Sequence, residues 1–168
     1  MFVYVVSREG RVTLIREALR TGIAAGLAMI PFAAVFQRFG LRVNEYGRKT
    51  LALLVGDVSA PLHYLLAFVQ HLAISWVAAV PLLLLLGRCS RKRDQLLVGL
   101  AYGAGFYVAV NSLALPFAFE DPIPWRLGVA AVYPSLLIHL VYGFTVALLA
   151  RPAAALARSR TRHEPDLR

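Results

Sequence analysis

The chain of 168 residues (18.4 kDa) is 59% hydrophobic and only 16% charged, with a mean hydropathy of +0.65. Soluble domains are about 45–50% apolar and about a quarter charged, so this composition excludes an ordinary soluble domain and a disordered chain, and the single cysteine excludes an internal disulfide. The net charge of +9 indicates that the chain contacts either a membrane surface or a nucleic acid. The positions of the basic residues decide between these two partners.

Four runs without Asp, Glu, Lys or Arg have about the length of membrane spans: residues 21–37, 62–86, 95–119 and 127–150. A helix needs about 20 apolar residues to cross a bilayer core, so the first run is short by one turn. Basic residues precede that run, as in a signal peptide, but no cleavage pattern followed by a mature domain comes after it, which favours a retained span. The sequence therefore predicts an all-α integral membrane protein, a single membrane domain with four transmembrane helices over residues 1–168.

The basic residues orient these spans, because Lys and Arg concentrate in cytoplasmic segments. The N-terminal segment, the loop 87–94 and the tail 151–168 carry 13 Lys and Arg, against 5 in the two opposite loops. Both termini are therefore predicted to be cytoplasmic, and the charge belongs to topology rather than to nucleic-acid binding. Four of those five residues lie in the first opposite loop, 38–60, whose run 50–55 is expected to lie along the membrane surface.

Small residues in two spans predict close helix contacts. The first span contains a GxxxG pattern at Gly22 and Gly26, and the third contains another at Gly99 and Gly103. In lipid such glycines let two helix backbones approach each other. The sequence leaves open whether the contacts form within the chain or at a homodimer seam. The second and fourth spans each carry a His-Leu pair, so the alternation of GxxxG and His-Leu is a weak internal repeat of two helices per unit.

Polar side chains on three spans fall at a similar depth. Counting about 1.5 Å per residue from the outer ends places His71, Asn111 and His139 about 14, 12 and 18 Å deep. They could form hydrogen bonds that fix helix packing, or a proton-responsive element, since histidine titrates near pH 6.5. A haem b between His71 and His139 is a third interpretation, whereas zinc would lack a further ligand at that depth. All nine Asp and Glu lie in loops or termini, which argues against a carboxylate-based proton pump.

Several motifs from Val69 onward follow one another in order. They are His71 with Ser75, a basic break before Gly99, Ala101 and Gly103, then Pro116, Ile123-Pro124-Trp125, His139-Leu140-Val141 and the tail His163-Glu164-Pro165-Asp166. Over about 100 residues this order resembles the YagU-like family of bacterial inner-membrane proteins. The resemblance implies a dimeric multi-span inner-membrane protein that is loosely associated with acid tolerance and has no known catalytic reaction.

The expected function is a non-enzymatic factor for acid stress or membrane integrity, since no P-loop, GxSxG, HExxH or CxxC motif is present. Its proton-responsive candidates are His71, His139 and Asn111, and no metal or cofactor is expected. One alternative is a haem-binding electron-transfer anchor that uses His71 and His139. Another is a structural partner subunit of a membrane complex or transporter. The expected partners are the lipid bilayer and a second copy or another membrane subunit, not nucleic acid.

Overall fold

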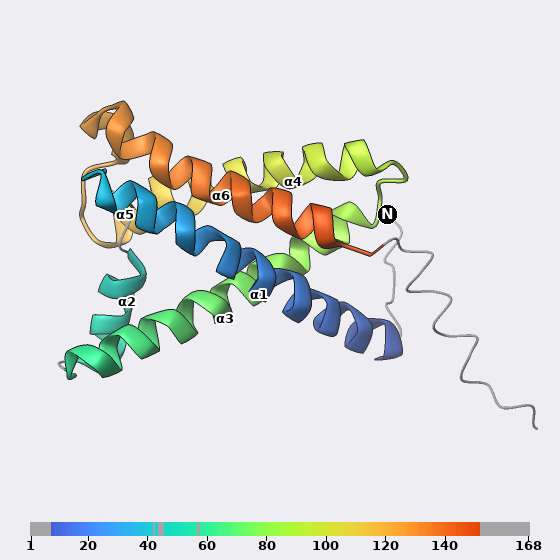
Figure 1. Ribbon diagram of the computed structural model, residues 1–168, viewed down its shortest axis with the longest axis horizontal. Helices are drawn as coiled ribbons and strands as arrows, with labels where there is room; N and C mark the ends of the chain where they lie inside the picture. Colours follow the sequence, from blue (N-terminus) through green and yellow to red (C-terminus); the bar gives the residue numbers. More distant parts are fainter. Residues whose placement is uncertain (1–7, 42, 44–45, 57, 152–168) are drawn as a thin grey trace, which may run out of the picture.

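The computed structural model describes residues 8–41, 43, 46–56 and 58–151. The tail 152–168, with the last motif of the family resemblance, lies outside the described residues. The elements in chain order are α1 (Arg8–Arg38), α2 (Tyr46–Val55), α3 (Ala60–Leu86), α4 (Lys92–Phe106), the π-helix η1 (Tyr107–Ala114), α5 (Leu115–Ala118), the 3-10 helix η2 (Pro124–Leu127) and α6 (Val129–Leu149) (Figure 1).

Among the described residues, four helical segments are long and apolar enough to cross a membrane: Val12–Arg38, Ala60–Leu86, Lys92–Ala118 and Val129–Leu149. This confirms the prediction of an all-α fold with four membrane spans. Lipid offers the backbone no hydrogen bonds, so a helix, which satisfies its own amides, is the structure that such runs adopt. The prediction that the first span is one turn short was wrong, because α1 continues back through the basic segment, whose Arg, Leu and Ala residues favour a helix.

The third span is not a uniform α-helix, although the sequence predicts one uninterrupted run. It consists of α4, η1 and α5, and the N–H of Leu115 donates to the carbonyl of Val110, five residues earlier. Pro116 explains the change, because its ring lacks an N–H and clashes with the carbonyl four residues earlier in a regular helix. A π-helical stretch before the proline accommodates that clash. The wider turn also carries Asn111, so it sets the direction of a polar side chain inside the span.

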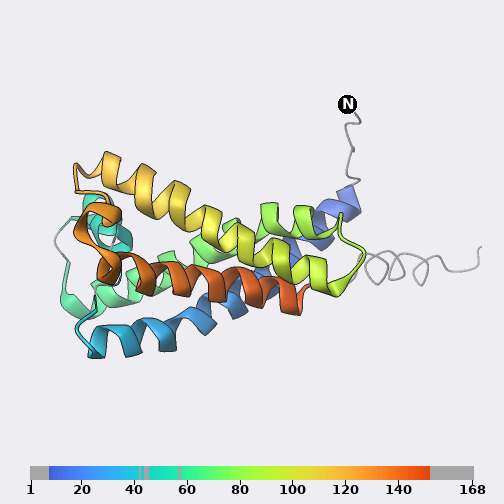
Figure 2. The ribbon, with the colours of Figure 1, turned by 90° about the horizontal axis from the view of Figure 1, so that it is seen from above.

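The helices pack as two antiparallel pairs joined through α6. In Figure 1, α1 (blue) crosses α3 (green), and Figure 2 shows α6 (orange) between α1 and the α4–η1 segment. The core between them is built from small and aliphatic side chains, which allow close approach. Its members include Ala18, Ala25, Met29, Ala79, Leu82, Leu86, Ile138, Val146 and Ala147.

Two cations bind the C-terminal carbonyls of α6. The Arg20 guanidinium donates to the carbonyl of Leu149 at 2.7 Å, and Lys92 Nζ donates to the carbonyls of Ala147 and Leu148 at 2.7 and 2.9 Å. The last carbonyls of a helix have no partner within it and carry its negative dipole end, so a cation stabilises them. We call this end of the bundle the basic end. It comprises the start of α1, the α3–α4 loop and the end of α6. Its cytoplasmic location stays a prediction.

Glu17 corrects the expectation that every acidic residue lies in a loop or terminus. It lies in α1, within the candidate span Val12–Arg38, and is only 5% exposed. Its carboxylate accepts hydrogen bonds from Arg20 at 2.6 Å and from the backbone N–H of Arg151 at 3.0 Å. Because α1 begins before the uncharged run, it carries this acid into the bundle, where both bonds satisfy it. Glu17 therefore ties α1 to the chain leaving α6.

The opposite end holds α2, which is longer than the surface segment 50–55 expected from sequence. Tyr46 at its start stacks on Phe119 with ring centroids 5.6 Å apart, and Lys49 pairs with the carboxylate of Asp121. Leu53 and Leu54 at its other end are 76% and 74% exposed. A short helix that combines basic and exposed apolar side chains is typical of the membrane interface. The aromatic stack and ion pair attach it to the end of the third span.

Candidate functional site

Asn111 and His139 form a hydrogen-bonded pair between η1 and α6. Asn111 Nδ2 lies 2.9 Å from His139 Nε2, and His139 Nδ1 lies 2.6 Å from the backbone carbonyl oxygen of Ser135. A carbonyl oxygen only accepts, so Nδ1 carries the hydrogen and donates it to Ser135. In a neutral ring Nε2 then has a lone pair, which accepts a hydrogen from the Asn111 amide. The neutral form of His139 is therefore satisfied at both nitrogens.

Aromatic rings from the α4–η1 segment surround this imidazole. Phe106 stacks on it with centroids 5.9 Å apart at 23°, and the Tyr107 ring lies 5.7 Å away at 53°. Tyr107 is completely buried. An apolar surround of this kind removes water from the ring and strengthens the bonds that the ring does make. Aromatic rings therefore flank the imidazole of the Asn111–His139 pair.

His71, the third member of that layer, has a different partner. It lies on α3, and its Nε2 is 3.0 Å from the carbonyl oxygen of Gly26 on α1. It is not part of the hydrogen-bonded pair of Asn111 and His139. The structure thus divides the predicted layer into an Asn111–His139 pair and a His71–Gly26 contact.

The first GxxxG pattern lies against α3 of the same chain. A Cβ built on Gly22 would be 2.6 Å from the carbonyl oxygen of Ser75, and one on Gly26 would be 2.7 Å from the Ser75 hydroxyl and 3.4 Å from Leu72. Only glycine tolerates this proximity, which is why the two helices cross there. The same close approach brings the Gly26 carbonyl within reach of His71.

The second GxxxG pattern lies against α6. A Cβ on Gly99 would meet the carbonyl oxygen of Gly143 and lie 2.6 Å from the Ala147 Cβ, while one on Gly103 would meet the carbonyl oxygen of His139. Gly103 therefore sets the spacing between α4 and the backbone that carries His139. Both glycine patterns are filled from within the chain, so a homodimer seam through either of them is ruled out in this fold.

The two glycine contacts are similar in arrangement but differ in register. The first glycine of each pattern lies nearest Ser75 in one pair and Gly143 in the other, which are 68 residues apart. The second glycine lies nearest Ser75 in one pair and His139 in the other, which are 64 residues apart. The weak sequence repeat therefore corresponds to two helix pairs that share a GxxxG crossing but not the same residue-by-residue contacts. His71 and His139 each precede a leucine, Leu72 and Leu140, in the sequence.

The structure also reveals buried polar groups outside the predicted layer of His71, Asn111 and His139. Among the described residues, three buried side-chain atoms have no hydrogen-bond partner: Gln70 Oε1, Tyr107 Oη and Ser112 Oγ. The sequence shows Gln70 and Ser112 as polar residues inside the spans, but it does not show that they lack a partner. A tyrosine in an apolar run resembles a packing residue, so the sequence carries no signal for Tyr107. Tyr107 is notable among them because its ring also contacts His139.

The haem alternative does not fit these residues. An axial ligand must offer iron a free nitrogen lone pair, and both ring nitrogens of His139 already bind Asn111 and Ser135. Within the described part of the chain, no three His, Cys, Asp or Glu side chains gather where they could hold a metal ion.

Together the four spans and the enclosed Asn–His pair define an α-helical multi-pass membrane protein with a polar contact inside its bundle. No family model, no curated protein and no solved structure matches the chain.

Proposed function

We propose that the chain is a non-enzymatic multi-pass protein of the bacterial inner membrane that contributes to acid tolerance or membrane integrity, and that His139 is its proton-responsive group. The observation that carries the proposal is the hydrogen bond from Asn111 to His139, enclosed between η1 and α6. Kinship with the YagU-like proteins is part of the same proposal and rests on the ordered motifs of the sequence.

Protonation of His139 reverses the direction of this bond. In the neutral ring Nε2 accepts a hydrogen from the Asn111 amide; in the charged ring Nε2 carries a hydrogen of its own and only donates. Asn111 must then turn its side chain to present Oδ1. Since Asn111 belongs to the π-helical stretch, a proton gained on α6 changes a contact with the third span. Such a pair has two states of different charge and different hydrogen bonding, which is what a proton sensor requires.

The surroundings of His139 make its charged state costly. The described groups against it are the rings of Phe106 and Tyr107 and its hydrogen-bond partners Asn111 and Ser135, and none of these carries a formal charge. The described Asp, Glu, Lys and Arg of the spans lie toward the helix ends, with Glu17 and Lys92 at the basic end. A charge inside an apolar bundle without a fixed counter-charge is expensive. Protonation therefore favours a looser arrangement around the pair.

His71 is the weaker candidate for the same role. Its Nε2 faces the Gly26 carbonyl, which only accepts. Both a neutral and a charged imidazole can donate to that oxygen, so protonation leaves the bond in place. We assign His71 mainly to the contact between α1 and α3.

The test compares survival at low pH of strains that carry His139→Gln, His71→Gln, His63→Gln or a deletion of the gene. His63 lies on α3 and serves as a matched histidine control. We expect the deletion and His139→Gln to lose acid survival and His63→Gln to keep it. Normal survival of the deletion strain would remove the acid-tolerance role. Normal survival of His139→Gln beside a sensitive deletion strain would remove the histidine mechanism.

A further inference from the structure

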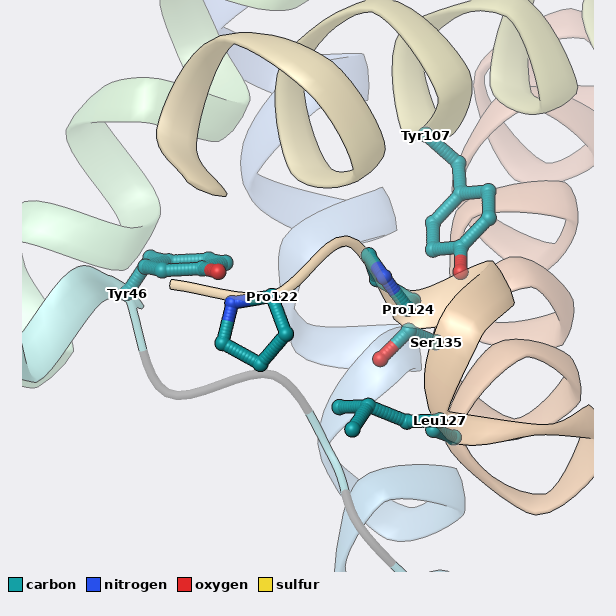
Figure 3. A pocket seen from close by; sticks show the side chains of 7 residues that line it. Tyr46, Tyr107, Pro122, Pro124, Leu127 and Ser135 are labelled. Atoms are coloured by element: carbon teal, nitrogen blue, oxygen red, sulfur yellow. The ribbon is translucent and has the colours of Figure 1, made fainter. Parts of the chain in front are cut away.

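A small cavity lies beside the loop of residues 122–127, between this loop and the first turns of α6 (Figure 3). Its volume is about 10 Å³, which is room for one water molecule. Three hydroxyl-bearing side chains line it, and the remaining lining residues are prolines and aliphatic side chains. The lining residues are Tyr46, Tyr107, Ser135, Pro122, Pro124, Leu127 and Ala131.

The Tyr107 hydroxyl marks this cavity as polar. Tyr107 is completely buried and its hydroxyl has no hydrogen-bond partner among the described residues. Figure 3 shows the hydroxyl directed toward Pro124 and Ser135, at the cavity. A buried hydroxyl without a partner costs free energy, and ordered water commonly supplies the missing bond where two or more polar groups converge. Tyr46, Tyr107 and Ser135 provide that convergence.

Two of these residues also contact the proton-responsive pair. The ring of Tyr107 lies 5.7 Å from the ring of His139, and the carbonyl of Ser135 accepts the Nδ1 hydrogen of His139 at 2.6 Å. Trp125, from the loop, packs edge-on against Tyr107 at 6.1 Å and is itself 49% exposed. The cavity therefore lies between an exposed loop and the residues that enclose His139.

We propose that this cavity binds one water molecule through the hydroxyls of Tyr107 and Ser135, and that this water is the route by which His139 exchanges hydrogen with the medium on the loop side. The inference rests on the proposed function only in concerning the same histidine: it describes hydrogen exchange at Nδ1, whereas the proposed sensor gains its proton at Nε2. Exchange begins when the hydrogen bond from Nδ1 to the Ser135 carbonyl opens. One Nδ1 hydrogen then leaves to water and another returns, so the ring keeps its charge. The ligand is water, held by neutral hydroxyls.

Tyr107→Phe tests the water-binding site. The measurement is the change in Tm of the full-length protein in lipid nanodiscs, and the sign of that change separates a hydrated cavity from a dry one. If water occupies the cavity, the variant loses a hydrogen bond and its Tm falls by about 2–4 °C. If the cavity is dry, the variant removes an unpaired buried hydroxyl and its Tm rises. An unchanged or higher Tm overturns the proposal.

Filling the cavity tests the route. Ala131 lines the cavity, whereas its neighbour Ala130 is exposed, so Ala131→Leu and Ala130→Leu form a matched pair. Hydrogen exchange at His139 Nδ1 is measured by NMR in histidine-labelled protein. We expect Ala131→Leu to slow this exchange about tenfold, because without the water the group exchanges only when the protein opens locally. We expect Ala130→Leu to leave the exchange rate unchanged. Equal rates in both variants overturn the route.

The two proposals fail separately. If Ala131→Leu does not fold, Tyr107→Phe in the same exchange measurement replaces it, with slower exchange again expected and an unchanged rate overturning the route. Acid survival of His139→Gln tests the proposed function alone. Slower exchange in the cavity variants together with normal survival of His139→Gln would leave the water route in place and remove the acid-tolerance role.

Discussion

Asn111 and His139, 28 residues apart in sequence, are joined by a 2.9 Å hydrogen bond that crosses from a π-helical stretch to α6. The bond depends on two local features of the chain. Pro116 favours the π-helical geometry that carries Asn111, and Gly103 lets α4 approach the backbone of His139. A polar contact inside the bundle is thus positioned by one proline and one glycine that do not take part in it.

Replacing Asn111 by leucine should destabilise the protein. Leucine has a similar size but cannot donate to His139 Nε2, which would be left without its partner. Polar contacts between membrane helices contribute about 0.6 kcal/mol on average and up to about 1.7 kcal/mol, and we expect a loss in that range. Reversible unfolding in mixed micelles measures it. Leu113→Ala, on the lipid-exposed side of the same segment, is the control, and an Asn111→Leu protein as stable as the wild type would contradict the assignment.

Alanine at Gly103 and at Gly105 should have opposite effects. A Cβ at Gly103 would collide with the carbonyl of His139, whereas a Cβ at Gly105 meets nothing within 4 Å. We expect Gly103→Ala to cost about 1–3 kcal/mol through the forced backbone shift. Gly105→Ala should be neutral or gain up to about 1 kcal/mol, because alanine favours a helix over glycine. Thermal unfolding of the two variants decides the matter, and equal losses would show that the helices do not cross at Gly103.

Lys92→Met should weaken the end of α6. The variant keeps the length of the side chain and removes the charge that binds the carbonyls of Ala147 and Leu148. A cation at a helix C-terminus contributes about 0.3–1 kcal/mol, so we expect a loss of that size and faster hydrogen exchange in the last turn of α6. Arg93→Met, at an exposed neighbouring position, is the control. Equal exchange in both variants would show that Lys92 does not hold this helix end.

Cys89, the single cysteine, offers a direct test of topology. It lies in the α3–α4 loop at the basic end. If the positive-inside prediction holds, a membrane-impermeant maleimide added to intact spheroplasts should not label it, and labelling should appear in inverted vesicles. Ser59→Cys in a Cys89→Ala background, at the opposite end of the bundle, should show the reverse pattern. Labelling of Cys89 from outside would invert the assigned orientation.

Local properties of the sequence were sufficient to predict the membrane spans and to predict that helices approach closely at the two GxxxG patterns. A long apolar run must hydrogen-bond its own backbone in lipid, so its composition alone predicts a helix. A GxxxG pattern likewise predicts a close crossing, but not the partner. The partner depends on which helices the chain brings together, and here both crossings, at Gly22 with Gly26 and at Gly99 with Gly103, are made within the chain.

The sequence by itself determined the membrane class, the number of candidate spans and the presence of His71, Asn111 and His139 within them. Only the tertiary structure decided how they pair, because a hydrogen bond depends on the rotation of each helix about its axis, which depth along the chain does not record. The π-helical stretch turns Asn111 toward His139, and the α1–α3 crossing directs His71 to the carbonyl of Gly26. The burial of Glu17 was likewise not predictable from the sequence. It depends on where α6 ends in space, because the backbone N–H of Arg151 binds the Glu17 carboxylate there.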